Sequence, residues 1–419
     1  MSAQETVSVL YPAMQSPQPP EWSAATWVGA LDLPAEPADH ITLDGAEGYR
    51  RARLLIRADG RPVALLTFAI ENGGLDGAQV AAAVSRWNGA DSVEQGAELT
   101  MPPITVVICT RNRVESLGAA VESVLCCEYP SFDLVVVDNA SDDDATEQFV
   151  TALGDPRISY VRESLPGLAV ARNAGVRAAR GEIVAFTDDD VVVDRLWLHW
   201  LGSTFAEEGR VGCVTGIVPS GELRTPTQSY FEQRVSWANS LARRTFDVSD
   251  PPPDKPLFPF QVGLYGTGAN FAIRRSAVIA IGGFDEALGA GSPTAGAEDI
   301  DMFVRLLMSN WHLIYEPAAI VWHRHRHDVN ALQAQARGYG LGLGAWLTKV
   351  ALDRTLRPMA VRRIGRALLH LQIISESPSV ADFEPPESLR RIQLTGIVRG
   401  PVALASARRQ GRRPTPFAS

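Results

Sequence analysis

Between residues 104 and 190 the chain alternates short, continuously apolar runs with segments of helical spacing. Strands that are apolar throughout are typical of a parallel sheet buried on both faces, and helices are the connections that such a sheet needs. The pattern therefore predicts an α/β fold with a mainly parallel sheet flanked by helices. The predicted strands are ITVVICT (104–110), DLVVVDNAS (133–141), RISYVRES (157–164) and EIVAFTDDD (182–190), and the predicted helices span 113–127, 143–153 and 167–180.

The 419 residues are enough for two or three domains, and the composition divides them into four regions. A flexible arm rich in Ser, Gln and Pro is expected over residues 1–22. A small α+β (ββα) module and its linker are expected over 23–100, because two strand-like runs surround an Asp-Gly turn and a helical segment follows. The α/β domain is expected over 101–330, and a helical, arginine-rich region over 331–419.

The second half of the α/β domain carries weaker but similar signals. They predict a strand at 211–218, a helix at 225–244, a strand and a helix within 266–286, a helix at 297–310, and one or two strands within 312–327. The glycine-rich run GYGLGLGAW (338–346) follows no clear strand, so we interpret it as a site of close helix packing and not as a phosphate-binding loop.

The charge of the chain is unevenly distributed. The formal net charge of −9 argues against a nucleic-acid-binding protein. From Leu352 to the end, however, twelve arginines face only five acidic residues. We interpret this region as a solvated helical surface, and the alternative is peripheral attachment to anionic lipid.

The four cysteines form no CxxC pair, and two of them are adjacent, which disfavours a disulfide. No secretion signal or stretch of about 18 apolar residues is evident. These features predict a cytoplasmic protein, with contact at the inner face of the membrane as the alternative that the basic tail leaves open.

Polar side chains follow three predicted strands at the point where each strand ends. They are Thr110, Arg111 and Asn112; Asp138 and Asn139; and Asp188, Asp189 and Asp190. Carboxyl ends of parallel strands meet at one edge of a sheet, where ligands bind. Alternating residues such as Asp188 and Asp190 share a side, and carboxylates suit Mg²⁺ or Mn²⁺. The alternative is a solvated acidic turn or a helix cap.

Eight motifs in a fixed order resemble those of the inverting family-two glycosyltransferases, which have the GT-A fold. They are CTRNR, VVDNAS, ARNAG, AFTDDDV, GTGANFAIRR, GGFDE, GAEDIDMFVRL and VWH, and they cover residues 104 to 327. The resemblance implies a nucleotide-diphospho-sugar transferase domain at 101–330. It also implies a sugar transfer from a nucleoside-diphosphate donor, with a UDP-sugar favoured, to an acceptor hydroxyl.

The resemblance implies a role for each matching residue. Nucleotide-sugar contacts fall on Thr110, Arg111, Asn112, Asp138, Arg172, Asp188 and Asp189. The ligands of Mn²⁺ or Mg²⁺ fall on Asp190 and His323, although three consecutive aspartates leave Asp189 open as a ligand. A zinc site built from His323, His325 and His327 is a weaker alternative, because HxHxH lacks the separated ligands of common structural sites.

The same resemblance places the acceptor side of the reaction. Asp299 matches the base that takes a proton from the acceptor hydroxyl, and Glu298, Gly268 and Asn270 are expected near the acceptor. The acids at 298–299 could also only cap a helix, since a helix N-terminus favours negative charge. Two other functions remain as alternatives, a degenerate sugar-nucleotide-binding scaffold and, less favoured, a nucleotidyltransferase.

Overall fold

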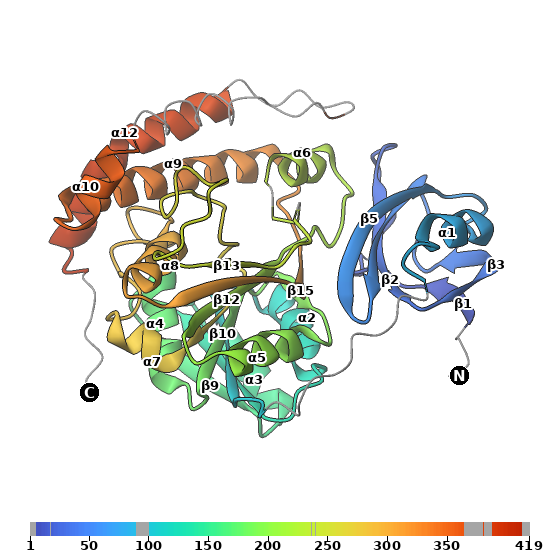
Figure 1. The fold of residues 1–419 in the computed structure, drawn as a ribbon, viewed down its shortest axis with the longest axis horizontal. Helices are drawn as coiled ribbons and strands as arrows, with labels where there is room; N and C mark the ends of the chain where they lie inside the picture. The colour runs from blue at the N-terminus through green and yellow to red at the C-terminus, as the bar shows by residue number, and fades with distance from the viewer. Residues whose placement is uncertain are drawn as a thin grey trace.

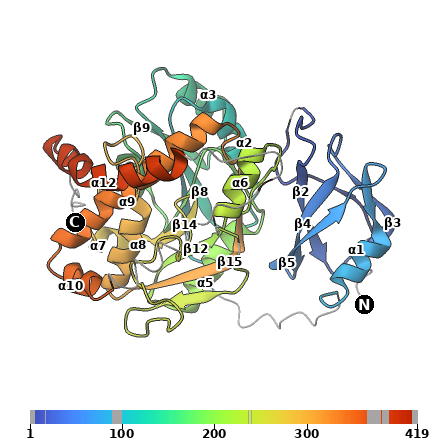
Figure 2. The same cartoon turned by 90° about the horizontal axis from the view of Figure 1, so that it is seen from above.

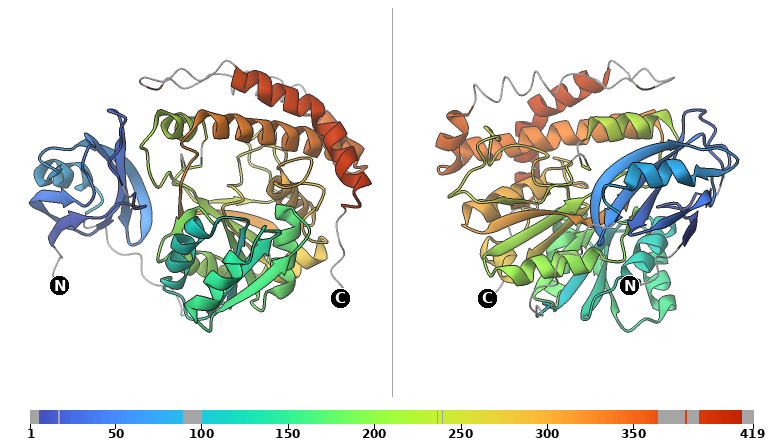
Figure 3. Two further views of the ribbon diagram at one scale, coloured as in Figure 1. Left: turned by 180° about the vertical axis from the view of Figure 1, so that it is seen from behind. Right: turned by 45° about the vertical axis from the view of Figure 1, so that its right-hand side comes forward.

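The computed structural model describes residues 6–16, 18–88, 100–235, 237–238, 240–363, 380 and 388–412. Most of the predicted linker, and residues 364–379 and 381–387, lie outside these residues. Figure 1 shows an α/β domain with the N-terminal module against one side and the C-terminal helices across the top. Two further views place the C-terminal end of the last helix on the side of the α/β domain away from the N-terminal module (Figure 3).

The α/β domain is built on one mixed, mainly parallel sheet of nine strands, as the sequence predicted. The strand order is β11-β15-β12-β14-β10-β7-β8-β9, and β13 pairs with β15. The strands are β7 (Ile104–Thr110), β8 (Phe132–Asn139), β9 (Ile158–Glu163), β10 (Ile183–Thr187), β11 (Val191–Val193), β12 (Val211–Ile217), β13 (Arg244–Phe246), β14 (Asn270–Arg274) and β15 (His312–His323). The first four strands of this domain, β7 to β10, are parallel to one another, so their carboxyl ends lie at one edge.

Helices cover both faces of this sheet because successive residues of each strand point to opposite sides. On one face α2 (Val114–Leu125), α3 (Ala145–Leu153) and α5 (Trp197–Glu207) pack on one hydrophobic cluster. On the other face α4 (Leu168–Ala178), α7 (Arg275–Ala280) and α8 (Glu298–Met308) pack on a second cluster. β7 contributes Val106 and Ile108 to the first cluster and Val107 to the second, which explains its unbroken apolar sequence.

The helix predicted at 225–244 is wrong in its second half. Thr225 and Gln228 form a capping box that begins α6 (Pro226–Arg234), but Val235 is already extended. The chain then returns as β13, whose Phe246 is buried against the rings of Phe258 and Tyr265. Pairing with β15 therefore prevails over the local helical preference of this segment.

The N-terminal module is larger than the predicted ββα unit and begins earlier. It contains β1 (Thr6–Leu10), β2 (Thr26–Leu33), β3 (Glu36–Leu43), β4 (Arg51–Ala58), β5 (Arg61–Ala69), β6 (Gly74–Asp76) and α1 (Gly77–Val84). The strands form two three-stranded sheets. The flexible arm expected over residues 1–22 is a wrong prediction where β1 pairs with β3, since Leu10 is buried in the module's core. The surrounding Ser, Gln and Pro residues concealed this short strand.

The C-terminal region is helical, as predicted, with α9 (Val329–Leu352), α10 (Leu356–Val361) and α12 (Ser388–Arg409). α9 and α12 lie side by side (Figure 2). A Cβ built on Gly340 or Gly344 of α9 would lie about 2 Å from a backbone carbonyl oxygen of α12, so only glycine fits there. The prediction that GYGLGLGAW serves close helix packing is confirmed. No helix in the described part of the chain has both the length and the apolar character to cross a bilayer.

Candidate functional site

The polar residues at the strand ends meet at one edge of the sheet. Thr110 lies beside Asp138 in the register of β7 and β8, and the three aspartates follow β10 directly. The end of β15 brings His323 opposite Val191, next to the last aspartate. The N-terminus of α8 adds Glu298 and Asp299 from a distant part of the chain.

Two of the three aspartates face His323, and the third turns away. Ligand atoms of Asp188, Asp190 and His323 all lie within 4.8 Å of one another. Asp189 instead accepts hydrogen bonds from Thr110 Oγ1 (2.8 Å) and Arg113 Nη1 (3.0 Å). The geometry therefore favours Asp188 and Asp190 as cation ligands. The hydrogen bonds of Asp189 instead anchor the loop after β7.

The charges around this cluster are only partly compensated. Burial raises the pKa of Asp188, with repulsion by Asp190 acting in the same direction. Burial also opposes ionisation of Asp190, but His323, Arg326 and Arg113 outweigh it and lower the pKa of Asp190. A divalent cation would stabilise the ionised form of both carboxylates.

The fit to a divalent metal is supported by the donor set itself. Two carboxylates and one imidazole are ligands that Mn²⁺ accepts readily, and carboxylates also suit Mg²⁺. The zinc alternative fails on one of its three histidines, because the side chain of His327 is 78% exposed and lies near Asp328. His325 is buried beside His323 and contacts Glu232, not the aspartates.

Asp138 presents a buried oxygen with no partner. Its Oδ2 atom accepts hydrogen bonds from Tyr160 (2.9 Å) and Arg162 (2.7 Å), both on β9. Its Oδ1 atom is buried and makes no hydrogen bond. A buried acceptor left unsatisfied costs free energy, so the atom is suited to an N–H or O–H group of a ligand.

Two further residues of the loop after β7, Asn112 and Arg111, differ in their surroundings. Asn112 adopts a left-handed backbone conformation and binds Ser141 and Asp142 of the loop after β8. It therefore joins two loops, and its side-chain amide is already engaged. Arg111 is exposed beside it.

Arg172 is buried next to Asp188 and Glu298. It donates to Glu298 Oε1 (2.9 Å) and to the carbonyl oxygen of Gly268 (2.9 Å), and it lies 3.9 Å from Asp188. Its guanidinium also lies over the ring of Phe271, 5.2 Å from the centroid. The predicted nucleotide contact is thus an internal cation that links α4, β14 and α8.

Asp299 and Glu298 differ in their surroundings although they are neighbours. Glu298 is buried against Arg172, and burial raises its pKa, with Asp299 adding repulsion. Asp299 is only partly buried and uses Oδ1 to accept from the N–H of Ile300. A Cβ built on Gly268 would lie 3.2 Å from Asp299 Oδ2 and 2.8 Å from Arg172, so this glycine leaves room beside the carboxylate.

The structure does not bring Asn270 to the acceptor side as expected. Its Oδ1 accepts from the indole of Trp197, and its Nδ2 donates to the carbonyl oxygens of Ile217 and Ala319. The side chain is fully buried with these three partners. It therefore locks neighbouring strands and does not face a ligand, because the sequence motif could not reveal which way β14 points this amide.

Four charged or phenolic residues at the site were missed in the sequence analysis. They are Arg113, Tyr160, Arg162 and Arg326. Arg113 lies within the CTRNR motif, and the period-two spacing of Tyr160 and Arg162 on β9 was a usable signal. Arg326 gave none, because its ion pair with Asp190 depends on where β15 ends.

Residues 105–282 match the profile of the family described as Glycosyl transferase family 2. A "Pre-mycofactocin glycosyltransferase" of Mycobacterium tuberculosis is 31% identical over 223 residues, which are 53% of this chain and 43% of that protein. A "Glucosyl-dolichyl phosphate glucuronosyltransferase" of Haloferax volcanii is 24% identical over 228 residues, 53% of this chain and 69% of that protein. The match thus spans less than half the length of the first of these relatives.

Among solved structures, the mannosyltransferase PcManGT of Pyrobaculum calidifontis, in complex with GDP-Man and Mn²⁺, is 19% identical. The similarity covers 80% of this chain and 93% of that one, with a TM-score of 0.44.

Proposed function

We propose that this chain, whose residues 105–282 match the Glycosyl transferase family 2 profile, is a metal-dependent inverting glycosyltransferase. The donor is a nucleoside-diphosphate sugar, with UDP-sugars the first to test. The acceptor is a hydroxyl group of a glycan, a lipid-linked sugar or a secondary metabolite. Residues 101–330 are the catalytic domain in this proposal.

One observation carries the proposal: ligand atoms of Asp188, Asp190 and His323 converge within 4.8 Å at the carboxyl ends of the strands. This is the edge at which open α/β sheets bind ligands. The residues would hold Mn²⁺ or Mg²⁺. When bound, the ion would neutralise charge on the donor's diphosphate and on the departing nucleoside diphosphate.

The protein's own residues supply the remaining steps. Asp138 Oδ1 accepts a hydrogen bond from the base or ribose of the donor, which satisfies its buried lone pairs. The oxygen of the acceptor hydroxyl attacks the anomeric carbon of the donor sugar, and Asp299 accepts the proton of that hydroxyl. The bond between the anomeric carbon and the diphosphate oxygen breaks in the same step. Arg172 forms an ion pair with Glu298 and neutralises its charge next to Asp299.

The test is a thermal-shift panel of UDP, GDP, TDP and CDP, each with Mn²⁺ or with EDTA. A ligand at one hundred times its dissociation constant adds about 2.7 kcal/mol of stability. We expect one nucleotide to raise the melting temperature only with the metal present, and its sugar conjugates are then assayed for transfer. Metal-dependent binding without any hydrolysis or transfer would support a degenerate scaffold, and absence of binding would contradict the donor site.

We also infer a peripheral location on an anionic membrane surface, in a reduced compartment such as the cytoplasm. All four cysteines are free. The outward face of α12 carries Leu394, Val398 and Val402, which are 50%, 78% and 73% exposed and lie four residues apart. Arg391 and Arg409 fall on the same exposed helical face, and residues 388–412 contain no acidic residue. An apolar stripe with cationic ends fits a lipid surface with negative headgroups.

Flotation with vesicles tests this location. Vesicles with about one third phosphatidylserine or phosphatidylglycerol should carry the protein upward, and pure phosphatidylcholine vesicles should not. A Val398→Asp/Val402→Asp variant should lose flotation and keep its nucleotide-dependent thermal shift. Unchanged flotation of that variant would exclude α12 as the lipid-binding face, and self-association that disappears in it would identify a second copy of the chain as the occupant.

A further inference from the structure

A chain of polar contacts runs from the cation site to the N-terminal module. His323 Nε2 lies 3.3 Å from Asp190, and His323 Nδ1 lies 3.2 Å from Nδ1 of His325. His325 Nε2 in turn lies 3.1 Å from Glu232 Oε2 on α6. The other oxygen of Glu232 lies 3.2 Å from Arg53 Nη1 on β4.

The hydrogen-bond partners of the two imidazoles decide where the hydrogens lie. The carboxylate of Glu232 only accepts, so the Nε2 atom of His325 carries a hydrogen. In the tautomer with this hydrogen, the lone pair of His325 is on Nδ1, which lies 3.2 Å from Nδ1 of His323. That lone pair accepts from Nδ1–H of His323. Nε2 of His323 can donate a hydrogen bond to the Asp190 carboxylate, 3.3 Å away. A divalent cation would take the place of that hydrogen, so Nε2 is the atom that would bind it.

The two imidazoles have little freedom to rotate out of this arrangement. The ring of Phe231 packs against His325 at 4.8 Å between centroids, and Trp237 packs edge-on against both histidines at 6.0 and 5.8 Å. Gln228 donates to the backbone carbonyl of His325 and fixes the main chain at that point. Packing and hydrogen bonding thus define one orientation for each ring.

We propose that His325 and Glu232 are positioning residues that hold His323 in its Nδ1–H tautomer, with Nε2 free to bind the divalent cation, and that Arg53 anchors Glu232 from the N-terminal module. This inference rests on the proposed metal-dependent function and deepens it. Partners of a metal-bound histidine fix its tautomer and its orientation, and their loss typically weakens metal binding 10- to 100-fold. No function was predicted for the N-terminal module from its sequence. Through this contact it supports the metal site.

We call the contacts from His323 through His325 and Glu232 to Arg53 the relay. Its test is Mn²⁺ binding, measured by the EPR signal of free Mn²⁺ in the presence of the nucleotide that the thermal-shift panel selects. Glu232→Leu should weaken binding about 10- to 100-fold. Glu232→Gln should restore most of it, because the amide oxygen can accept the same hydrogen bond from His325. Arg53→Met should have a smaller effect in the same direction. Arg61→Met is the matched control, because Arg61 pairs with Glu316 across the same module boundary but lies outside the relay.

A spectroscopic measurement separates positioning from general stabilisation. Long-range ¹H–¹⁵N spectra of the histidine side chains of the wild-type protein are assigned with a His323→Asn variant. With the protein saturated by diamagnetic Mg²⁺ and the selected nucleotide, they should show His323 as the Nδ1–H tautomer. The Nε2–H tautomer in that spectrum would overturn the relay. So would a folded Glu232→Leu variant with wild-type Mn²⁺ affinity. If instead the wild-type protein binds no Mn²⁺ with any nucleotide, the metal site of the proposed function itself is refuted.

Discussion

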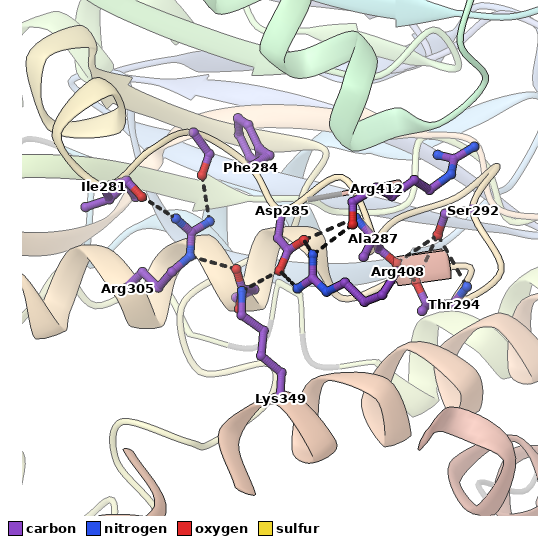
Figure 4. Close-up of polar contacts among 12 residues, drawn as sticks. Ile281, Phe284, Asp285, Ala287, Ser292, Thr294, Arg305, Lys349, Arg408 and Arg412 are labelled. Atoms are coloured by element: carbon purple, nitrogen blue, oxygen red, sulfur yellow. Dashed lines mark hydrogen bonds and ion pairs between the residues drawn. The ribbon is translucent and has the colours of Figure 1, made fainter. Parts of the chain in front are cut away.

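Two acidic clusters in this molecule differ in how completely their charge is compensated. The first contains Asp188 and Asp190 at the strand ends, where burial raises the pKa of Asp188 and no internal group fully offsets it. The second is centred on Asp285, after α7, and is covered by the C-terminal helices (Figure 4). Both clusters are buried, but only the first contains a carboxylate, that of Asp188, whose burial is not offset by neighbouring cations.

The second cluster is neutralised entirely from within the chain. Arg408 on α12 donates two hydrogen bonds to Asp285, at 2.7 and 2.5 Å, and Lys349 on α9 lies 2.7 Å from the same carboxylate. Lys349 also pairs with Asp301 (2.7 Å), which in turn accepts from Arg305 (2.7 Å). Burial opposes ionisation of Asp285, but these cations lower its pKa to about 2.

The comparison teaches that a buried carboxylate is informative about function only when its partners are known. Asp285 lies in the GGFDE motif and resembles a site residue in the sequence, but its partners make it a clasp between the α/β domain and the helices α9 and α12. The surrounding cations lower the pKa of Asp190 but do not offset the burial of Asp188 beside it, which supports the proposed cation site at the strand ends. Four predictions sharpen the distinction.

The largest effect is expected from Asp299→Asn. The amide cannot take the proton of the acceptor hydroxyl, so the transfer rate should fall roughly 10²- to 10⁴-fold. Donor binding, measured by the nucleotide-induced thermal shift, should be unchanged because Asp299 makes no contact with the cation ligands. Transfer within tenfold of wild type would show that another group acts as the base.

The next effect is expected from Asp190→Asn, which removes one carboxylate from the proposed metal site. The Mn²⁺ affinity should fall at least about 100-fold, beyond the usual loss of an outer partner, and transfer should fall with it. The matched substitution in the other cluster, Asp285→Asn, should leave Mn²⁺ affinity unchanged in the folded protein. Equal losses in both variants would remove the distinction between the clusters.

A third prediction concerns stability. Arg408→Met leaves Asp285 with Lys349 alone and should lower the free energy of unfolding by about 1.5–3 kcal/mol, the range for hydrogen bonds to charged groups. Arg409→Met, one residue along and exposed, should change it by less than about 0.5 kcal/mol. Urea unfolding measures both, and transfer per folded molecule should stay at the wild-type value. Identical stabilities of the two variants would contradict the clasp.

The smallest effect is the pH dependence of the same clasp. The pKa of Asp285 in the folded protein, about 2, lies below its ordinary value of 3.8. Its contribution, about 2 kcal/mol, is therefore present above pH 4 and lost as the pH falls towards 2. The stability gap between wild type and Asp285→Asn should narrow over that interval in urea titrations. A gap that stays constant from pH 5 to pH 2 would show that the ion pairs are not its source.

The sequence predicted the parallel half of the sheet almost strand for strand. β7, β8, β9 and β10 end within a few residues of their predicted limits, because runs such as VVICT and VVVD are buried on both faces and leave no competing pattern. It was less successful where the chain pairs over long distances. β1 was hidden in a polar arm, and β13 lay inside a predicted helix, since both strands form only against partners far along the chain.

The candidate site divides in the same way. Asp188 and Asp190 were expected to share a side from their spacing, and His323 was expected beside them from the family resemblance; the fold brings the three together. Asn270 was expected near the acceptor but is buried against Trp197, and Arg326 was not expected yet reaches Asp190. Whether a polar side chain faces a ligand or the interior is set by the twist and the end of its strand, which no motif encodes.

The sequence by itself determined the α/β domain and the edge of the sheet at which its polar groups gather, because the apolar periodicity and the order of strand ends are local properties. Only the tertiary structure decided which carboxylates are free. The partners of Asp285 are Lys349 and Arg408, 64 and 123 positions further along the chain (349 − 285 and 408 − 285). Those of Asp189 lie 76 and 79 positions before it, and Glu232, which contacts His325, lies on α6. The ionisation of a buried group depends on the charges and hydrogen-bond donors that surround it in space, and these are assembled only when the chain folds.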